Sequence, residues 1–247
     1  MNSRSSFELN KPGALSTWFG SVTHILFPER CLFCRAVLLS SEGPPTCSSC
    51  AGSFTPAGYI CPVCERLLPG GEACSCCLTF PCLQSLFALS FYEKQWRFLL
   101  HSLKYHKRRS LARPLGRWLG LEITGSMICQ PDLVVPVPLH RRREKERGYN
   151  QSSLIAHHTA RVLGKKCLPL LKKTTDTISQ ATLSRRERFE NIRGVFSCSE
   201  TPLLGTTVLL IDDIYSTGST LNEAAKALCR SGAEVHGAVI AYNPLIK

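Results

Sequence analysis

The chain has 247 residues, of which 44% are hydrophobic and 19% are charged. This length allows one large or two small globular domains, and the composition excludes an intrinsically disordered protein. The formal net charge is +12, which permits a polyanionic partner but does not by itself show one.

Cysteine and charge are distributed in opposite ways along the chain. Residues 1–82 hold ten of the 14 cysteines and carry five basic and five acidic residues, so the whole net charge belongs to residues 83–247. The split predicts a neutral cysteine-rich module and a basic, cysteine-poor domain. We expect an N-terminal segment over 1–28, a cysteine module over 29–82 and a phosphate-binding domain over 83–247.

The N-terminal segment has apolar residues at helical spacing between Leu15 and Leu26. This pattern predicts a short amphipathic helix, which either packs on the neighbouring domain or docks on a membrane surface or a partner. The sequence has no apparent secretory signal and no run of about 18 apolar residues. We therefore expect a cytoplasmic protein without a transmembrane segment, with peripheral association at the inner face of the membrane as the alternative.

Four closely spaced cysteine pairs follow one another in the cysteine module. Two intervening residues aim both thiolates of a pair at one cation, and two pairs complete the tetrahedral sulfur shell that zinc prefers. In a reducing compartment metal binding is favoured over redox-active or disulfide-linked cysteines, which are the alternative. We expect two structural zinc ions in zinc-ribbon hairpins, bound by Cys31, Cys34, Cys47 and Cys50 and by Cys61, Cys64, Cys74 and Cys77. A cross-braced arrangement, in which the first and third pairs share one ion, is the other possible pairing, and Cys76 in place of Cys77 is the alternative ligand of the second site.

Strand and helix patterns alternate after the cysteine module, which predicts an α/β fold with a parallel sheet and helices on both faces. The expected strands cover residues 85–92, 133–137, 167–171, 207–211 and 235–242. The expected helices cover residues 95–105, 111–123, 151–163 and 219–230. Ligands of such sheets bind outside the carboxyl ends of the strands.

The most informative stretch is residues 208–220. An apolar strand is expected to end at two adjacent carboxylates, Asp212 and Asp213, and a turn of small residues then opens into a helix. The turn offers N–H groups, hydroxyls and the positive end of a helix dipole to an anion, and Gly218 allows close approach of the backbone. Two carboxylates beside a phosphate would repel the ligand unless they bind its hydroxyls or a divalent cation. The stretch predicts a site for a sugar phosphate; a capped helix start after a core strand is the structural alternative.

This stretch resembles the phosphoribosyl pyrophosphate (PRPP) loop of type I phosphoribosyltransferases. With the cysteine pairs in front, the chain resembles the ComF family of competence-associated proteins over about residues 26–242. The resemblance also includes residues 103–107, 135–143, 147–151 and 180–188, and extends to Asn191 and Phe196. It implies a type I phosphoribosyltransferase-like sheet behind a small zinc-ribbon module.

The resemblance also implies roles for individual residues. Asp212 and Asp213 would be the catalytic pair that contacts the ribose hydroxyls. The 5-phosphate of PRPP would be held by Tyr215, Ser216, Thr217, Gly218, Ser219 and Thr220. The pyrophosphate, accompanied by Mg²⁺, would bind Pro138, Leu139, His140, Arg141 and Arg147. A loop that closes over substrate would contain Arg185, Arg186 and Arg188. The structural alternative for the predicted pyrophosphate loop is a solvated basic helix start or loop. The alternative for the predicted closing loop is an exposed polar helix.

The basic residues between positions 94 and 117 predict a second anionic ligand, a nucleic acid. Lys104, Lys107, Arg108 and Arg109 are the expected nucleic-acid contacts. The aromatic residues among them are Trp96, Phe98 and Tyr105, which either stack on the bases of a single strand or belong to the core.

Three functions are open at the level of the sequence. The family's association with natural transformation implies a protein that handles incoming single-stranded DNA on the cytoplasmic side, beside a helicase-like partner. The sequence shows no evident base-recognition hood, so an active phosphoribosyltransferase of nucleotide metabolism would have an unidentified acceptor. The third function is a PRPP-responsive regulator without turnover.

Overall fold

A computed structural model describes most of the chain. The described residues are 28–38, 43–68, 74, 77, 82–126, 130–175, 194–199 and 202–244. The expected N-terminal helix and the expected lid residues Arg185, Arg186 and Arg188 lie outside them. Within the described residues, no helix combines the length and apolar character needed to cross a membrane.

A seven-stranded sheet of order β2-β1-β3-β9-β8-β4-β5 forms the centre of the molecule, and β6 and β7 form a separate two-stranded sheet. The strands are β1 Pro56–Ile60, β2 Leu67–Leu68, β3 Leu83–Phe91, β4 Leu133–Pro136, β5 Lys166–Cys167, β6 Leu171–Lys173, β7 Phe196–Cys198, β8 Thr207–Tyr215 and β9 Glu234–Tyr242. From β3 to β5 all neighbours in the large sheet are parallel, whereas β1 and β2 pair in antiparallel fashion at one edge. The predicted parallel α/β sheet is confirmed.

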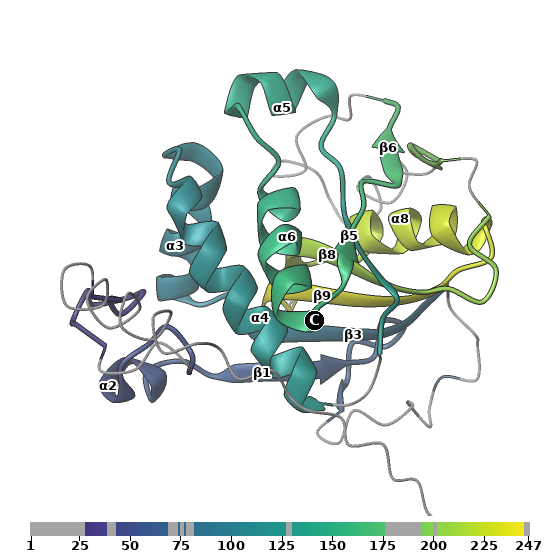
Figure 1. The fold of residues 1–247 in the computed structure, drawn as a ribbon. Coiled ribbons are helices and arrows are strands. Elements are labelled where there is room, and N and C mark those ends of the chain that lie inside the picture. The colour runs from purple at the N-terminus through teal and green to yellow at the C-terminus, as the bar shows by residue number, and fades with distance from the viewer. Residues whose placement is uncertain are drawn as a thin grey trace, which may run out of the picture.

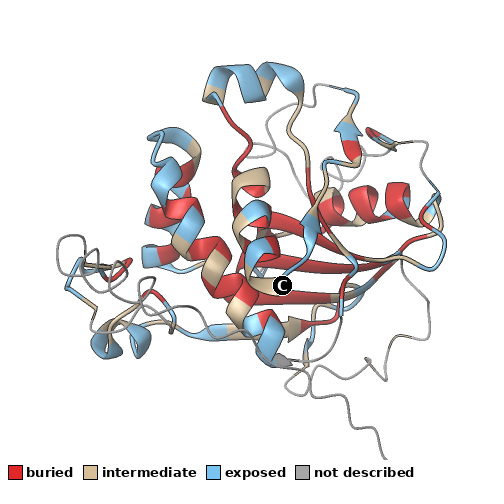
Figure 2. Ribbon diagram, viewed as in Figure 1, coloured by how far each residue is buried: buried red, intermediate tan, exposed pale blue. Residues whose placement is uncertain are grey.

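Helices cover both faces of this sheet (Figure 1). The described helices are α2 Ser48–Ala51, α3 Lys94–Tyr105, the 3₁₀ turn η1 Arg109–Leu111, α4 Ala112–Ser126, α5 Arg141–Arg147, α6 Gln151–Leu163 and α8 Ser219–Cys229. The helices α3, α4 and α6 share one hydrophobic core with the sheet, and α8 shares the other. Figure 2 shows buried residues concentrated in the strands and on the inward sides of these helices.

The helices α4 and α6 pack at unusually close range because α4 carries two glycines at their contact. A Cβ atom on Gly116 would lie 2.4 Å from the carbonyl oxygen of Ile155, and one on Gly120 would lie 2.7 Å from Cβ of Val162. The hydroxyl of Thr159 also donates to the carbonyl of Gly116 at 3.0 Å. This contact fixes α6, whose N-terminus supplies part of the site described below.

Two of the predicted strands differ from the structure by more than two residues at an end. The expected strand over 167–171 divides into β5 and β6, because Pro169 between them has no N–H to continue the ladder. The strand expected to end at Ile211 continues as β8 to Tyr215, because β9 pairs with β8 as far as Tyr242 after β4 has ended.

The basic residues after β4 form a helix, which agrees with one of the structural alternatives. In α5 the ring of His140 accepts a hydrogen bond from the backbone N–H of Arg142, and the helix ends at Gly148, whose φ is +81°. The helix α6 covers the expected residues, Gln151–Leu163; the side chain of Asn150 caps its start, and Gly164 follows its end with φ +65°.

The cysteine module is joined to the main sheet through β1. This strand pairs with β2 on one side and with β3 on the other, so the hydrogen-bonded sheet runs across residue 82. The division into modules at that residue stays a prediction.

Candidate functional site

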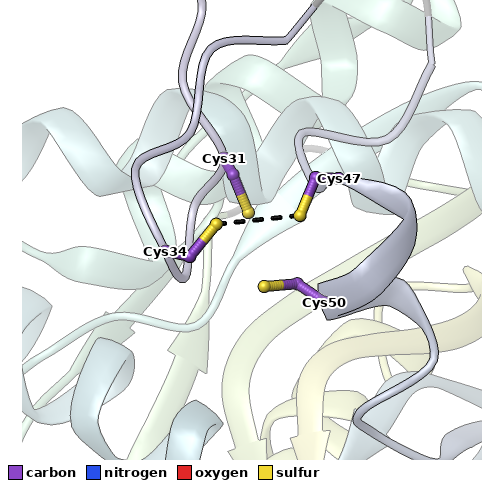
Figure 3. A group of neighbouring side chains, drawn as sticks. All are labelled: Cys31, Cys34, Cys47 and Cys50. Atoms are coloured by element: carbon purple, nitrogen blue, oxygen red, sulfur yellow. Dashed lines mark hydrogen bonds between the residues drawn. The ribbon is translucent and has the colours of Figure 1, made fainter.

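Eight cysteines form two separate clusters. Within each cluster the four sulfur atoms lie within 4.8 Å of one another. The clusters are Cys31, Cys34, Cys47 and Cys50, and Cys61, Cys64, Cys74 and Cys77. Figure 3 shows the first set pointing toward a common centre, with the sulfurs of Cys34 and Cys47 3.7 Å apart. The described cysteines thus group as consecutive pairs and not in the cross-braced arrangement. Four thiols at this spacing are compatible with a structural zinc ion in each cluster.

The two clusters begin with the same local backbone structure. The N–H of Arg35 donates to the carbonyl of Cys31 at 3.0 Å, and the N–H of Glu65 donates to that of Cys61 at 2.9 Å. Arg35 and Glu65 also share a left-handed conformation, with φ of 67° and 61°. Non-glycine residues seldom adopt this conformation. Its presence directly after the first cysteine pair of each cluster shows that both pairs use the same turn geometry.

The thiols of each cluster differ strongly in acidity. Burial acts to raise the pKa of Cys31, but backbone hydrogen bonds, the largest from Cys34, outweigh it and lower the pKa to about 6. Burial and the neighbouring thiols raise the pKa of Cys50 to about 12. In the second cluster a backbone hydrogen bond is the main cause that lowers the pKa of Cys64 to about 7, and burial raises that of Cys77 to about 12. Four thiolates therefore require a cation between them.

The clusters contact different parts of the molecule. Beside the first cluster, the rings of Phe33 and Phe54 lie 5.3 and 5.5 Å from that of Trp96 on α3. Beside the second cluster, the carbonyl of Pro62 accepts a 3.4 Å hydrogen bond from the hydroxyl of Tyr215 at the end of β8. The first cluster is thus anchored in the helical core, and the second lies next to the predicted PRPP loop.

A pocket of about 330 Å³ opens at the carboxyl ends of the parallel strands. Tyr92 follows β3, Pro138 follows β4 and Asn243 follows β9, and all three line it. The other lining residues are Lys104, Tyr105, Val137, Leu139, Arg143, Arg147, Gln151, Ser152, Lys173, Asp212, Asp213, Ile214, Ser216 and Thr220. A second cavity, of about 380 Å³, shares several of these residues. The pocket lies at the edge of the sheet that the strand pattern predicts.

Asp212 is buried at the base of this pocket and carries a raised pKa. Its Oδ1 accepts hydrogen bonds from the hydroxyl of Ser152 at 2.8 Å and from the backbone N–H of Asp213 at 2.9 Å. Burial, followed by the charge of Asp213, raises the pKa of Asp212 to about 7, although Ser152 and Lys104 act in the opposite direction. Near neutral pH this carboxyl can therefore accept or donate a hydrogen bond.

Asp213 is paired inside the pocket with a lysine from α3. The Nζ atom of Lys104 lies 2.6 Å from Oδ2 of Asp213, and only 6% of the carboxylate side chain is exposed. Burial acts to lower the pKa of Lys104, but the two carboxylates outweigh it and raise the pKa. The lysine thus remains charged and neutralises part of the negative charge of the acid pair.

The turn after β8 is compact and rich in hydroxyls. The hydroxyls of Thr217 and Ser219 lie 2.8 Å apart and are buried, whereas Ser216 and Thr220 line the pocket. Gly218 has a φ of +73°, and a Cβ atom there would lie 2.4 Å from the hydroxyl of Tyr215. A side chain at this position would displace the tyrosine, so the turn depends on glycine.

The predicted pyrophosphate residues do not all reach the pocket. Pro138, Leu139 and Arg147 line it, as does Arg143 from the same helix. His140 and Arg141 are not among the described residues that line the pocket. His140 caps α5, and Arg141 is exposed.

The predicted nucleic-acid cations are also separated. Lys104 lies in the pocket, Lys107 lines the adjacent cavity, and Arg108 lines a different groove beside the first cysteine cluster. Arg109 donates to the carbonyl of Gly148 at 2.8 Å and so joins η1 to the turn between α5 and α6.

The aromatic residues of α3 divide between core and surface. Trp96 is fully buried, whereas the side chains of Phe98 and Tyr105 are 62% and 63% exposed. Trp96 as a surface for stacking bases is therefore wrong, because its ring fills the core between the first cluster and α4.

Several residues of the pocket were not predicted from the sequence. Ser152, Gln151, Tyr105, Lys173 and Asn243 line it, and Ser152 bonds directly to the acid pair. The only local signal was the polar start of α6, whose first residue, Gln151, is also the last residue of the resemblance segment 147–151. The other three, Tyr105, Lys173 and Asn243, lie at the ends of α3, β6 and β9. These elements are far apart in the sequence, so no local pattern indicates that the three residues meet at one pocket.

Residues 150–245 match the family model described as phosphoribosyl transferase domain. The DNA utilization protein YhgH of Salmonella typhi is 35% identical over 217 residues, which cover 83% of this chain and 93% of that protein. Competence protein F of Haemophilus influenzae is 30% identical over 217 residues, which cover 84% and 94%. The chain belongs to the ComF family. Another ComF-family relative, competence protein ComFC of Bacillus subtilis, is 25% identical over 213 residues, which cover 80% and 83%. These relatives make the chain a competence-related ComF protein with a phosphoribosyltransferase-type domain.

Proposed function

We propose that this ComF-family chain binds PRPP with Mg²⁺ in the 330 Å³ pocket and acts on single-stranded DNA as it enters the cytoplasm. The observation that carries the proposal is the buried pair of Asp212 and Asp213, followed by the phosphate-type turn and faced by Arg143 and Arg147. Support for the DNA part comes from relatives that are named for competence and DNA utilization.

Each part of the pocket suits one part of PRPP. Asp212 and Asp213 can accept hydrogen bonds from the ribose hydroxyls, and the start of α8 suits the 5-phosphate. Arg143 and Arg147 suit the pyrophosphate, because guanidinium groups bind its oxygens in a bidentate manner. The acid pair offers the oxygen ligands that Mg²⁺ prefers, but Asp213 is already paired with Lys104. We therefore place the Mg²⁺ on the pyrophosphate of the ligand, where it would neutralise charge.

Isothermal titration with PRPP and Mg²⁺, with and without a single-stranded oligonucleotide, tests this proposal. We expect one site per chain, and a loss of affinity of about 10- to 100-fold in Asp213→Asn. The matched control is Asp132→Asn, since Asp132 lies before β4, away from the carboxyl ends of the strands, where its Oδ2 accepts from Thr207. Wild-type protein that does not bind PRPP would refute the proposal.

A second candidate function is a PRPP-responsive regulator without turnover. The ion pair between Lys104 and Asp213 favours it, because a lysine already occupies the carboxylate that a ribose would use. Bound PRPP that stays intact for hours, measured by a coupled assay for pyrophosphate, would support the regulator. Release of pyrophosphate with a nitrogen base as acceptor would instead identify an active phosphoribosyltransferase.

A further inference from the structure

A groove of about 430 Å³ lies between the first cysteine cluster and α3. We call it the α3 groove. The buried side chains of Leu32 and Leu99 form apolar parts of its lining, and Phe98 adds an aromatic ring that is 62% exposed. The groove is distinct from the 330 Å³ pocket beside Asp212 and Asp213, which we call the sugar-phosphate pocket. The two have no lining residue in common among the described residues.

The charged residues that line the α3 groove are positive. Arg35 beside Cys34, Lys94 at the start of α3 and Arg108 directly before η1 all line it, and all three are exposed. Among its described lining residues none is acidic. An apolar floor with an exposed ring and a cationic rim matches a partner that carries flat apolar groups on a polyanionic backbone.

The two walls of the α3 groove are held together. Cys34 and Cys50 of the first cluster line one wall, and the hydroxyl of Ser53 donates to the side chain of Gln95 on the other wall at 3.3 Å. This hydrogen bond links the two walls, and a fixed wall reduces the ordering cost of binding a flexible ligand.

We propose that the α3 groove binds single-stranded nucleic acid, with a base stacked on Phe98 and the phosphates beside Arg35, Lys94 and Arg108. The inference rests on the proposed DNA function and gives it a location. That location differs from the run of cations expected from the sequence, because Lys104 is paired with Asp213 and Arg109 bonds to Gly148.

The exposed face of α3 extends this surface toward the sugar-phosphate pocket. Phe98 and Tyr105 are seven residues apart, which places them on the same face about 10.5 Å apart along the axis. The ring of His101, between them, lies 4.7 Å from that of Tyr105. Since Tyr105 also lines the sugar-phosphate pocket, a strand that leaves the groove along α3 would end beside that pocket.

Fluorescence anisotropy with a labelled 20-nucleotide oligo-dT tests the inference on the full-length, zinc-loaded chain. We expect Phe98→Ala to weaken binding about 5- to 100-fold, since each stacked base contributes in this range. Lys94→Ala with Arg108→Ala should lower the slope of log K against log salt by about 1.4, or about 0.7 for each phosphate contact. The matched control for charge is Lys165→Ala, at an exposed lysine that follows the C-terminal end of α6 and does not line the groove, and it should leave affinity and slope close to wild type.

PRPP titration of the same variants separates this inference from the proposed function. Unchanged PRPP affinity together with weakened oligo-dT binding supports the α3 groove. Wild-type oligo-dT affinity in both groove variants would overturn the groove while the PRPP proposal stands. A wild-type chain that binds PRPP and an acidic peptide but not oligo-dT would also overturn it, and would identify a protein partner instead.

Discussion

Two regions of the molecule gather groups that repel one another when all are ionised, and they resolve the repulsion in different ways. At the acid pair, Lys104 lies 2.6 Å from Asp213, and Asp212 has its pKa raised to about 7, so a lysine and a proton of the protein itself reduce the charge. In the cysteine clusters the pKa of Cys50 and that of Cys77 rise to about 12 beside more acidic neighbours, mainly through burial. The acid pair is balanced from within, whereas the clusters need an external cation.

Metal removal should have the largest effect, because it leaves the clusters without their cation. We expect about two zinc ions per chain by mass spectrometry, and loss of the folded cysteine module when a strong chelator removes them. A structural zinc contributes on the order of 10 kcal/mol to folding of a small module, far more than any single side chain. Circular dichroism and thiol titration measure the change. Recovery on addition of zinc is the control, and a zinc-free chain with unchanged thiol reactivity would contradict the comparison.

Acidity provides the next test, because a carboxyl of the acid pair keeps its proton up to about pH 7. The pKa of Asp212 is about 7 in the folded chain against 3.8 when unperturbed. The folded state therefore binds more protons than the unfolded state between these pH values, and stability falls as pH rises from about 4 to about 7. Asp212→Asn removes this contribution, which amounts to about 4 kcal/mol over that range.

Urea unfolding at several pH values measures this contribution as the difference between variant and wild type. We expect the difference to grow toward pH 7 in favour of Asp212→Asn and then to level off. Asp132→Asn, before β4, is the control and should follow the wild-type curve. Parallel curves for Asp212→Asn and wild type would show that Asp212 does not hold the proton.

The parts of the site that are local in sequence could be predicted, and the parts that depend on distant contacts could not. The cysteine pairs and the order of strand, acid pair, turn and helix are each contained in short segments, so their residue types and spacing indicated them. Lys104 reads as one more surface cation in a basic run, because Asp213 is more than one hundred residues away in the chain.

The errors in the fold have a similar cause. The carboxyl end of β8 depends on pairing with β9, and β1 joins the sheet only through β3, which no pattern within either segment indicates. Conversely, the expected helix over 151–163 has the observed bounds, because helix ends depend on one or two residues: Asn150 caps the start and Gly164 follows the end.

Removal of the lysine should destabilise the chain by about 3 kcal/mol. Lys104→Met leaves Asp213 buried, charged and beside another carboxyl, which is the costly way to break a buried pair. Adding Asp213→Asn should recover most of the loss, so the two effects are not additive. Lys107→Met, at an exposed lysine beyond the end of α3, is the control and should change stability by less than about 0.5 kcal/mol. Additive losses in the double variant would mean that the pair does not balance the site.

Ser152→Ala should have the smallest effect and reports on how finely the acid pair is tuned. The variant loses the 2.8 Å hydrogen bond to Oδ1 of Asp212, which costs about 1 kcal/mol. Because this bond lowers the pKa of Asp212, its removal should raise that pKa above about 7 and extend the fall of stability to higher pH. Urea unfolding between pH 4 and pH 9 measures the shift, with Ser153→Ala on the same helix as the control. If the pH at which stability levels off does not move, the proton on Asp212 is set by burial and by the charge of Asp213 alone, without help from α6.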